Sequence, residues 1–228
     1  GKFVAGPLER GYGTTIGNSL RRILLSSLQG AAITSVNIEG VKHEFSTIPG
    51  VVEDITEIIL NFKEVVLDIG DKEQVTLRID ADSEGEVTAG MITGDPGITV
   101  VNPDHHIASL NAGAKLNVEL VARRGRGYVV SESFKDENDP IGAIAIDAVF
   151  SPVRKVNHIV TNARVGQTTD YDKLTLEVWT DGSVSPENAV QGAASILRDQ
   201  LNVFAGVQEE VVEEEKPVED DGPKFNEN

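Results

Sequence analysis

Three glycines stand ahead of the first amphipathic segment of the chain and could form a phosphate-binding turn. Gly11, Gly13 and Gly17 read G-x-G-x-x-x-G, with two threonines among them. A glycine-rich turn that opens a helix can hold a phosphate on free backbone N–H groups. The spacing differs from the dinucleotide fingerprint, and the lysine of a Walker A loop is absent. We therefore expect the glycines to shape a turn, and keep a phosphate- or nucleotide-binding protein that uses the 11–17 turn as the alternative.

The remaining reactive residue types show no catalytic or metal-binding pattern. The chain has no cysteine, and its four histidines, His43, His105, His106 and His158, lack the spacing of a zinc motif. No G-x-S-x-G nucleophile elbow occurs. The sequence predicts no catalytic residue, no metal site and no cofactor.

Composition limits the partners that this chain can bind directly. The 228 residues carry a formal net charge of −17, and the sequence pI is about 4.6. Nucleic acids and anionic membranes bind proteins with a surplus of Lys and Arg, so direct contact with either is not expected. No apolar run is long enough for a transmembrane helix, and no signal peptide is visible. Residues 207–228 hold nine acids and two lysines, which predicts a disordered acidic linker.

The segment from about 15 to 28 predicts an amphipathic helix that ends at Gly30. Five apolar residues fall on one face and predict a buried side: Ile16, Leu20, Ile23, Leu24 and Leu28. Leu25 falls on the opposite side, next to Arg22. This pair is either a singly exposed leucine, which is common on protein surfaces, or part of a protein-binding patch.

A second helix is predicted from Ser185, as N-cap, to about residue 204, with Gly206 as its stop. Its apolar residues cover nearly half of its circumference, so it lies either between two layers of its own domain or against another copy of the chain. A third, shorter helix is predicted within 48–63, with one apolar face formed by Val51, Val52, Ile55, Ile58, Ile59 and Phe62.

Most of the remaining chain predicts strands, with β-branched or alternating runs at 74–80, 97–102, 115–124, 142–153, 155–166 and 173–182. The longer helices lie toward the two ends, and the middle third is nearly all β. This arrangement predicts an α+β protein in which a β-rich segment interrupts a domain built from both ends.

Several blocks together resemble the N-terminal assembly domain of bacterial RNA polymerase alpha subunits: LERGYGTTIGNSLRRILLSSL (8–28), PIGAIAIDAVFSPVRKVNH (140–158) and DYDKLTLEVWTDGSVSPENAV (170–190). The resemblance implies a discontinuous α/β dimerisation domain over 1–29 and 153–206, a β-rich insert domain over 30–152, and an acidic flexible linker over 207–228. It also implies a cytoplasmic, nucleoid-associated subunit of a nucleotidyltransferase, with no active site of its own. Such a subunit homodimerises and serves as the assembly platform for the beta and beta-prime subunits. It meets DNA only indirectly and no membrane. Members of the family begin with a further strand, so we expect the native start of the protein to precede Gly1.

Site residues follow from the same resemblance. It assigns docking of the beta subunit to Arg21, Arg22 and Leu25. It assigns the dimer interface to Ile23, Leu24, Leu28, Val190, Ala194, Leu197, Leu201 and Phe204. Contact with beta-prime is assigned to Arg124, Arg126 and Tyr128, and contact with transcription activators to a loop that contains Asp136 and Glu137. A further hypothesis is a stand-alone regulatory binding module, whose partner would not be a polymerase subunit.

Overall fold

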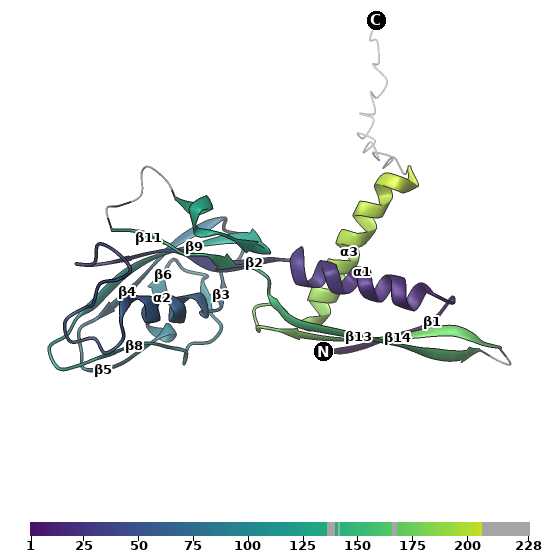
Figure 1. Cartoon of the computed structure of the whole chain (residues 1–228), viewed down its shortest axis with the longest axis horizontal. Coiled ribbons are helices and arrows are strands. Elements are labelled where there is room, and N and C mark those ends of the chain that lie inside the picture. Colours follow the sequence, from purple (N-terminus) through teal and green to yellow (C-terminus); the bar gives the residue numbers. More distant parts are fainter. Residues whose placement is uncertain (136–139, 141, 166–167, 207–228) are drawn as a thin grey trace, which may run out of the picture.

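Two lobes lie side by side in the computed structural model, which describes residues 1–135, 140, 142–165 and 168–206 (Figure 1). The helical lobe consists of β1 (Lys2–Leu8), α1 (Tyr12–Ser26), β13 (Val153–Val165), β14 (Thr168–Thr180) and α3 (Pro186–Ala205). The sheet lobe consists of the elements between α1 and β13. The predicted α+β class is confirmed, with both ends of the described chain in one lobe and the β-rich middle in the other.

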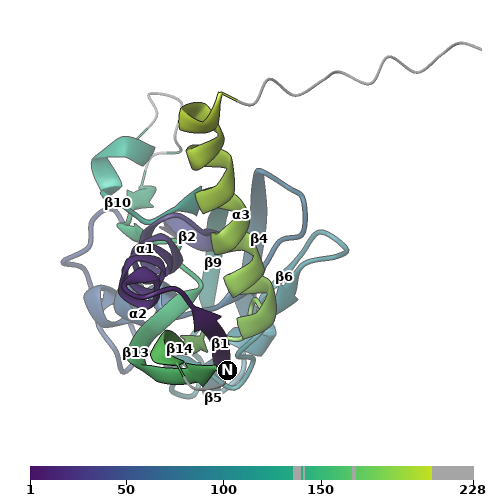
Figure 2. The ribbon, with the colours of Figure 1, turned by 90° about the vertical axis from the view of Figure 1, so that its right-hand side faces the viewer.

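The helical lobe is a three-stranded antiparallel sheet with α1 and α3 on one face. The strand order is β1-β14-β13, and both helices lie on the same side of the sheet (Figure 2). Apolar side chains from the helices and strands meet between them and form one core: Leu20, Leu24, Leu28, Val153, Val156, Leu176, Val178, Ala189 and Ala193. The helices therefore owe their position to burial of their apolar stripes against this sheet.

The sheet lobe contains most of the strands. Its elements are β2 (Gln29–Ile38), α2 (Ile55–Lys63), β3 (Leu67–Asp68), β4 (Gln74–Ala81), β5 (Gly85–Thr88), η1 (Ala89–Met91), β6 (Thr93–Gly94), β7 (Thr99–Val100), β8 (His106–Leu110), β9 (Leu116–Arg126), β10 (Tyr128–Val129), η2 (Ser131–Phe134), β11 (Ile144–Ala145) and β12 (Ala148–Val149). The largest sheet has the order β11-β2-β9-β4-β6.

Strict alternation places one face of this sheet in the core. In β4, Val75, Leu77, Ile79 and Ala81 are buried, whereas the residues between them are exposed. The buried face packs with α2, whose Ile55, Ile58, Ile59 and Phe62 belong to the same apolar cluster. The other face is polar, as expected for an antiparallel sheet that meets solvent on one side.

The first helix differs from its prediction at both ends. It begins at Tyr12, three residues earlier than expected, because Gly11 adopts a φ of 90° and serves as N-cap. It ends at Ser26 rather than at Gly30, which lies within β2. The sequence pattern did not predict strand β2, because the residues of its first half are small and alternate only weakly between polar and apolar. A Cβ at Gly30 would overlap the Phe150 carbonyl oxygen, so this glycine permits close backbone approach where β2 joins the two lobes.

The helix predicted at the end of the chain is confirmed. Ser185 accepts a hydrogen bond from the Asn188 N–H at 3.2 Å, Pro186 follows it, and Gly206 ends α3 with a φ of 66°. Helix α2 is shorter than predicted, because Asp54 and Glu57 form a capping box that starts it at Ile55. Val51 and Val52 therefore precede the helix. The predicted strand at 97–102 is reduced to β7, and that at 142–153 is split into β11 and β12.

Candidate protein-docking surfaces

The glycines of α1 allow the helix to lie directly on the sheet. A Cβ at Gly13 would come within 2.8 Å of Val160 Cγ1, and a Cβ at Gly17 within 2.8 Å of His158 Cδ2. Real Cβ atoms almost never make contacts this short, so any other residue would force either these side chains or α1 itself to shift. The glycines that suggested a phosphate cradle instead provide close helix–sheet packing.

A carboxylate of the chain itself already occupies the N-terminus of α1. The backbone N–H groups of Gly11 and Gly13 donate to Asp172 Oδ2 at 2.9 and 3.1 Å. A phosphate at this helix terminus would have to displace that carboxylate and then share the position with its negative charge. The geometry therefore argues against the phosphate-binding alternative.

The outer face of α1 carries exposed basic and apolar side chains together. Arg21 and Arg22 are exposed, and Leu25 is 37% exposed. The Ser26 hydroxyl donates to the Arg22 carbonyl oxygen at 2.7 Å in the last turn of the helix. This bond involves the Arg22 backbone and not its guanidinium group. The helical-wheel prediction that Leu25 faces away from the core is confirmed.

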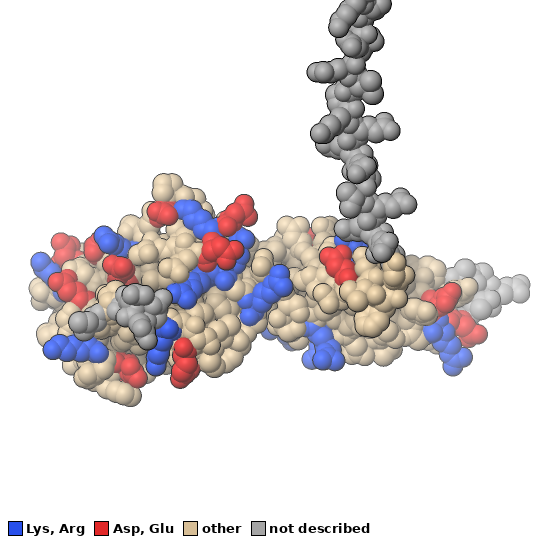
Figure 3. Space-filling view, turned by 90° about the horizontal axis from the view of Figure 1, so that it is seen from above, with Lys and Arg blue, Asp and Glu red and all other residues tan. Residues whose placement is uncertain are grey.

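An apolar groove runs between α1 and α3 and has a volume of about 560 Å³. Its lining residues come from both helices: Tyr12, Thr15, Ile16, Ser19 and Leu20 from α1, and Ala194, Leu197, Arg198, Leu201, Asn202 and Ala205 from α3. Beyond the groove, the end of α3 extends away from the sheet (Figure 1), with Leu201 55%, Val203 78% and Phe204 88% exposed. From above, the surface over these helices is mostly uncharged, whereas Lys and Arg side chains gather closer to the sheet lobe (Figure 3).

The eight residues assigned to a dimer interface occupy different environments. Leu24 and Leu28 are buried within one chain. Ile23, Val190 and Leu197 are half-buried, and Ala194, Leu201 and Phe204 are exposed. Leu24 and Leu28 expose little or no surface to a partner, so a dimer contact through this set depends on its six half-buried and exposed members.

The residues assigned to beta-prime contact lie along β9 and β10. Arg124 is half-buried and its guanidinium lies 3.7 Å from Asp71 Oδ1. Arg126 is exposed, and Tyr128 is 60% exposed. A hydrogen bond to the Asp147 carboxylate raises the pKa of the Tyr128 phenol. Asp136 and Glu137, assigned to activator contact, lie outside the described residues.

The histidines occupy separate positions, and among the described residues no cluster of His, Asp and Glu has an arrangement that could hold a metal ion. His43 contacts Ser46 Oγ at 3.1 Å, His105 contacts the Asn61 carbonyl oxygen at 2.9 Å, and His158 faces α1 beside Gly17. Within the same described part of the chain, no helix is both long and apolar enough to cross a membrane.

His106 is held between two carboxylates, an arrangement that the sequence did not indicate. Its Nε2 lies 2.9 Å from Glu53 Oε1 and its Nδ1 lies 2.8 Å from Glu86 Oε1. Both ring nitrogens can donate only when the imidazole is protonated. The hydrogen bond to Glu53 raises the pKa of His106 above 6.5; burial opposes this, and Glu86 adds to it.

Glu53 is held on its other side by β8. Burial opposes ionisation of Glu53, but hydrogen bonds from the Ser109 backbone and from His106 outweigh it and lower its pKa below 4.5. The Ser109 N–H donates to Glu53 Oε2 at 2.6 Å. The cluster therefore ties the segment before α2 to β5 and β8.

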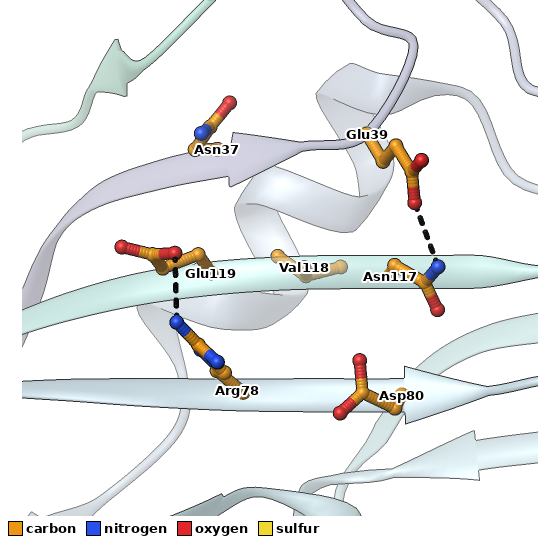
Figure 4. Close-up of a pocket in the computed structure, with 7 residues that line it drawn as sticks. All are labelled: Asn37, Glu39, Arg78, Asp80, Asn117, Val118 and Glu119. Carbon is orange, nitrogen blue, oxygen red and sulfur yellow. Dashed lines mark hydrogen bonds and ion pairs between the residues drawn. The ribbon is translucent and has the colours of Figure 1, made fainter. Parts of the chain in front are cut away.

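The polar face of the large sheet contains a shallow hollow of about 320 Å³. Figure 4 shows its side chains, with the Arg78 guanidinium near the Glu119 carboxylate at 3.6 Å and the Asn117 amide donating to Glu39 at 2.7 Å. Arg78 and Glu119 pair across the neighbouring strands β4 and β9, and Glu39, just after β2, pairs with Asn117 of β9. The hollow shows no constellation of a nucleophile with a base.

These features define a class: an α+β protein with exposed apolar and basic helix surfaces of the kind that bind other proteins. Comparison with known proteins identifies the family. Residues 36–151 match the family model described as the RNA polymerase Rpb3/RpoA insert domain. The chain is 57% identical over 229 residues to the DNA-directed RNA polymerase subunit alpha of Geobacter metallireducens, which covers 100% of this chain and 67% of the relative.

A second relative, the DNA-directed RNA polymerase subunit alpha of Moorella thermoacetica, is 56% identical over 219 residues, or 96% of this chain and 70% of the relative. The chain belongs to the family of bacterial DNA-directed RNA polymerase alpha subunits. Its role is that of an alpha subunit, within a complex that is a nucleotidyltransferase.

The close packing of α1 on the sheet predicts the effect of enlarging Gly17. Gly17→Val should lower the free energy of unfolding by about 1–3 kcal/mol, because the added Cβ alone would lie 2.8 Å from His158 Cδ2 and 3.0 Å from Leu174 Cδ1. Chemical denaturation measures the change. Asn18→Ala, at an exposed position one residue along α1, is the control and should be neutral or slightly stabilising, because alanine has the higher helix propensity. Equal stability of Gly17→Val and the parent would contradict the packing.

The Glu53–His106–Glu86 cluster predicts a dependence of stability on pH. Because folding raises the pKa of His106, its contribution is complete below 6.5 and is lost as the pH rises through the raised value. Folding lowers the pKa of Glu53, so its contribution is present above 4.5 and is lost on acidification. Both contributions are present together between these values.

His106→Gln should therefore reduce the fall in unfolding free energy as the pH rises above 6.5. Denaturant titrations across this range measure the fall, and His43→Gln, which leaves the cluster intact, should retain it. A parallel pH dependence in His106→Gln and the parent would show that the imidazole does not bridge the two carboxylates.

Proposed function

We propose that this alpha subunit homodimerises through the α1–α3 groove and then acts as the assembly platform for the other polymerase subunits. In this proposal, the beta subunit docks on one protomer and beta-prime on the other, in the cytoplasm. The observation that carries the proposal is the apolar groove next to the exposed end of α3. Membership of the alpha-subunit family identifies the complex as RNA polymerase. The exposed helix surfaces suggest where this subunit would contact its partners in that complex.

A second copy of the chain is the occupant that best fits the groove. The end of α3 presents Leu201, Val203 and Phe204 to solvent on one helix, directly beside the groove. In a two-fold pair, the α3 end of each chain reaches the groove of the other, so one type of contact forms twice. Burying one such side chain contributes about 1.5–3 kcal/mol. This arrangement removes the apolar helix end from water without any further partner.

The outer face of α1 is the proposed site for beta. Arg21, Arg22 and Leu25 are exposed on the helix. Arginine beside an aliphatic side chain is typical of interface centres, since its planar group pairs with carboxylates and its stem packs on apolar surface. None of these three residues lines the groove, so one protomer could engage beta and a second copy at once.

The remaining contacts are proposed for the sheet lobe and the linker. We propose that residues 1–29 and 153–206 form the dimerisation domain, that residues 30–152 form an insert domain, and that residues 207–228 form the linker. Exposed Arg126 and Tyr128, together with Arg124, are the proposed contacts with beta-prime. Asp136 and Glu137 are proposed to meet activators, and the link to DNA is proposed to be indirect.

The proposed dimer predicts the effect of a charge at the α3 end. Leu201→Asp with Phe204→Asp should weaken self-association by roughly hundredfold, because a carboxylate placed in an apolar interface loses its hydration. Sedimentation equilibrium measures the dissociation constant. Gln200→Asp, which adds one carboxylate at an exposed position of α3 outside the groove lining, should leave the dimer intact. A dimer that survives both substitutions would rule out this interface.

The proposed beta site predicts a separate loss of function. Arg22→Ala should reduce affinity for isolated beta subunit by at least about tenfold, because its charged contacts with beta would be lost. The variant should still dimerise. Size-exclusion chromatography with light scattering distinguishes the two events, and Arg154→Ala, at an exposed arginine on β13, is the control. Unchanged beta binding by Arg22→Ala would remove Arg22 from the interface.

A further inference from the structure

The first turn of α1 has no local cap. Its N-cap is Gly11, which offers no side-chain acceptor, and the first turn contains no acidic residue. The leading N–H groups of a helix need partners, and the residue at the N-cap usually supplies one. Here the partner comes from β14, far along the chain.

Asp172 supplies that partner with a single oxygen. Its Oδ2 accepts from the Gly11 N–H at 2.9 Å and from the Gly13 N–H at 3.1 Å. A capping box divides these two tasks between two residues of one helix, whereas Asp172 performs both from the neighbouring sheet. Gly13 makes room for the carboxylate, because a Cβ there would lie 3.1 Å from the same oxygen.

The same residue also holds the strand that leads into the helix. Asp172 pairs with Leu8 at the end of β1 and, on its other side, with Asn162 of β13. One residue of β14 therefore contacts both the end of β1 and the start of α1. Tyr12 and Thr15, which lie in the capped turn, line the apolar groove. Order in this turn therefore sets the shape of one end of the groove.

We propose that Asp172 is a positioning residue that orders the first turn of α1 and thereby shapes the groove for a second copy of the chain. The second half of this inference rests on the proposed function. The negative charge of Asp172 also complements the positive end of the helix dipole. Both the hydrogen-bonding oxygen and the charge of Asp172 therefore stabilise the first turn of α1.

Substitution of Asp172 tests the inference with two independent readouts. In Asp172→Ala, amide hydrogen exchange across the first turn of α1 should accelerate by roughly threefold to tenfold, the range for loss of a helix cap. The dimer dissociation constant should rise by a similar factor. Asp170→Ala, at an exposed carboxylate two residues earlier on β14, is the control and should change neither.

Chemical rescue separates capping from a general loss of stability. Sodium formate, a free carboxylate, should slow exchange in the first turn of Asp172→Ala and leave Asp170→Ala unchanged. If Asp172→Ala does not fold, Asp172→Asn, which keeps an acceptor oxygen but loses the charge, takes its place, and exchange in its first turn should be faster than in the parent chain.

Each outcome decides one part of the inference. Unchanged exchange in the first turn, or no response to formate, would overturn the capping role. Accelerated exchange with an unchanged dimer constant would overturn the positioning role. If the parent chain is monomeric, the dimer itself fails, and exchange with formate rescue still decides whether Asp172 caps α1.

Discussion

The close contact between α1 and the strands β13 and β14 is the constraint on which the rest of the helical lobe depends. Glycines at positions 13 and 17 bring the helix backbone onto the sheet, and Leu24 is buried beneath it. Because this face of α1 is buried against the sheet, two other sides of the helix remain exposed. One side forms the groove with α3, and the other carries Arg22 and Leu25.

Local patterns predicted the helices well. The wheel of α1 separated a buried stripe from Leu25, and the Ser185, Pro186 and Gly206 signals gave the bounds of α3. Both succeeded because caps and periodicity depend on neighbours in sequence. Strand β2 was missed, because its pairing with β9 rather than its own composition makes it a strand.

The site was predictable only in part for the same reason. Exposure of Arg22 and Leu25 follows from the helical period, whereas the residues that support the site lie far apart in the chain. Asp172 meets Gly11 across 161 positions, and His106 meets Glu53 across 53. No spacing rule connects such pairs, so a glycine-rich turn that resembled a phosphate cradle could be explained only from three-dimensional packing.

We propose that one chain binds a second copy and a beta subunit at the same time, on separate surfaces. Native mass spectrometry of the chain mixed with isolated beta subunit distinguishes simultaneous binding from competition. Simultaneous binding predicts a complex of two alpha chains with one beta, beside free alpha dimer. A complex of one alpha with one beta, in which beta displaces the second copy, would contradict it, because the two partners would then compete for a single surface.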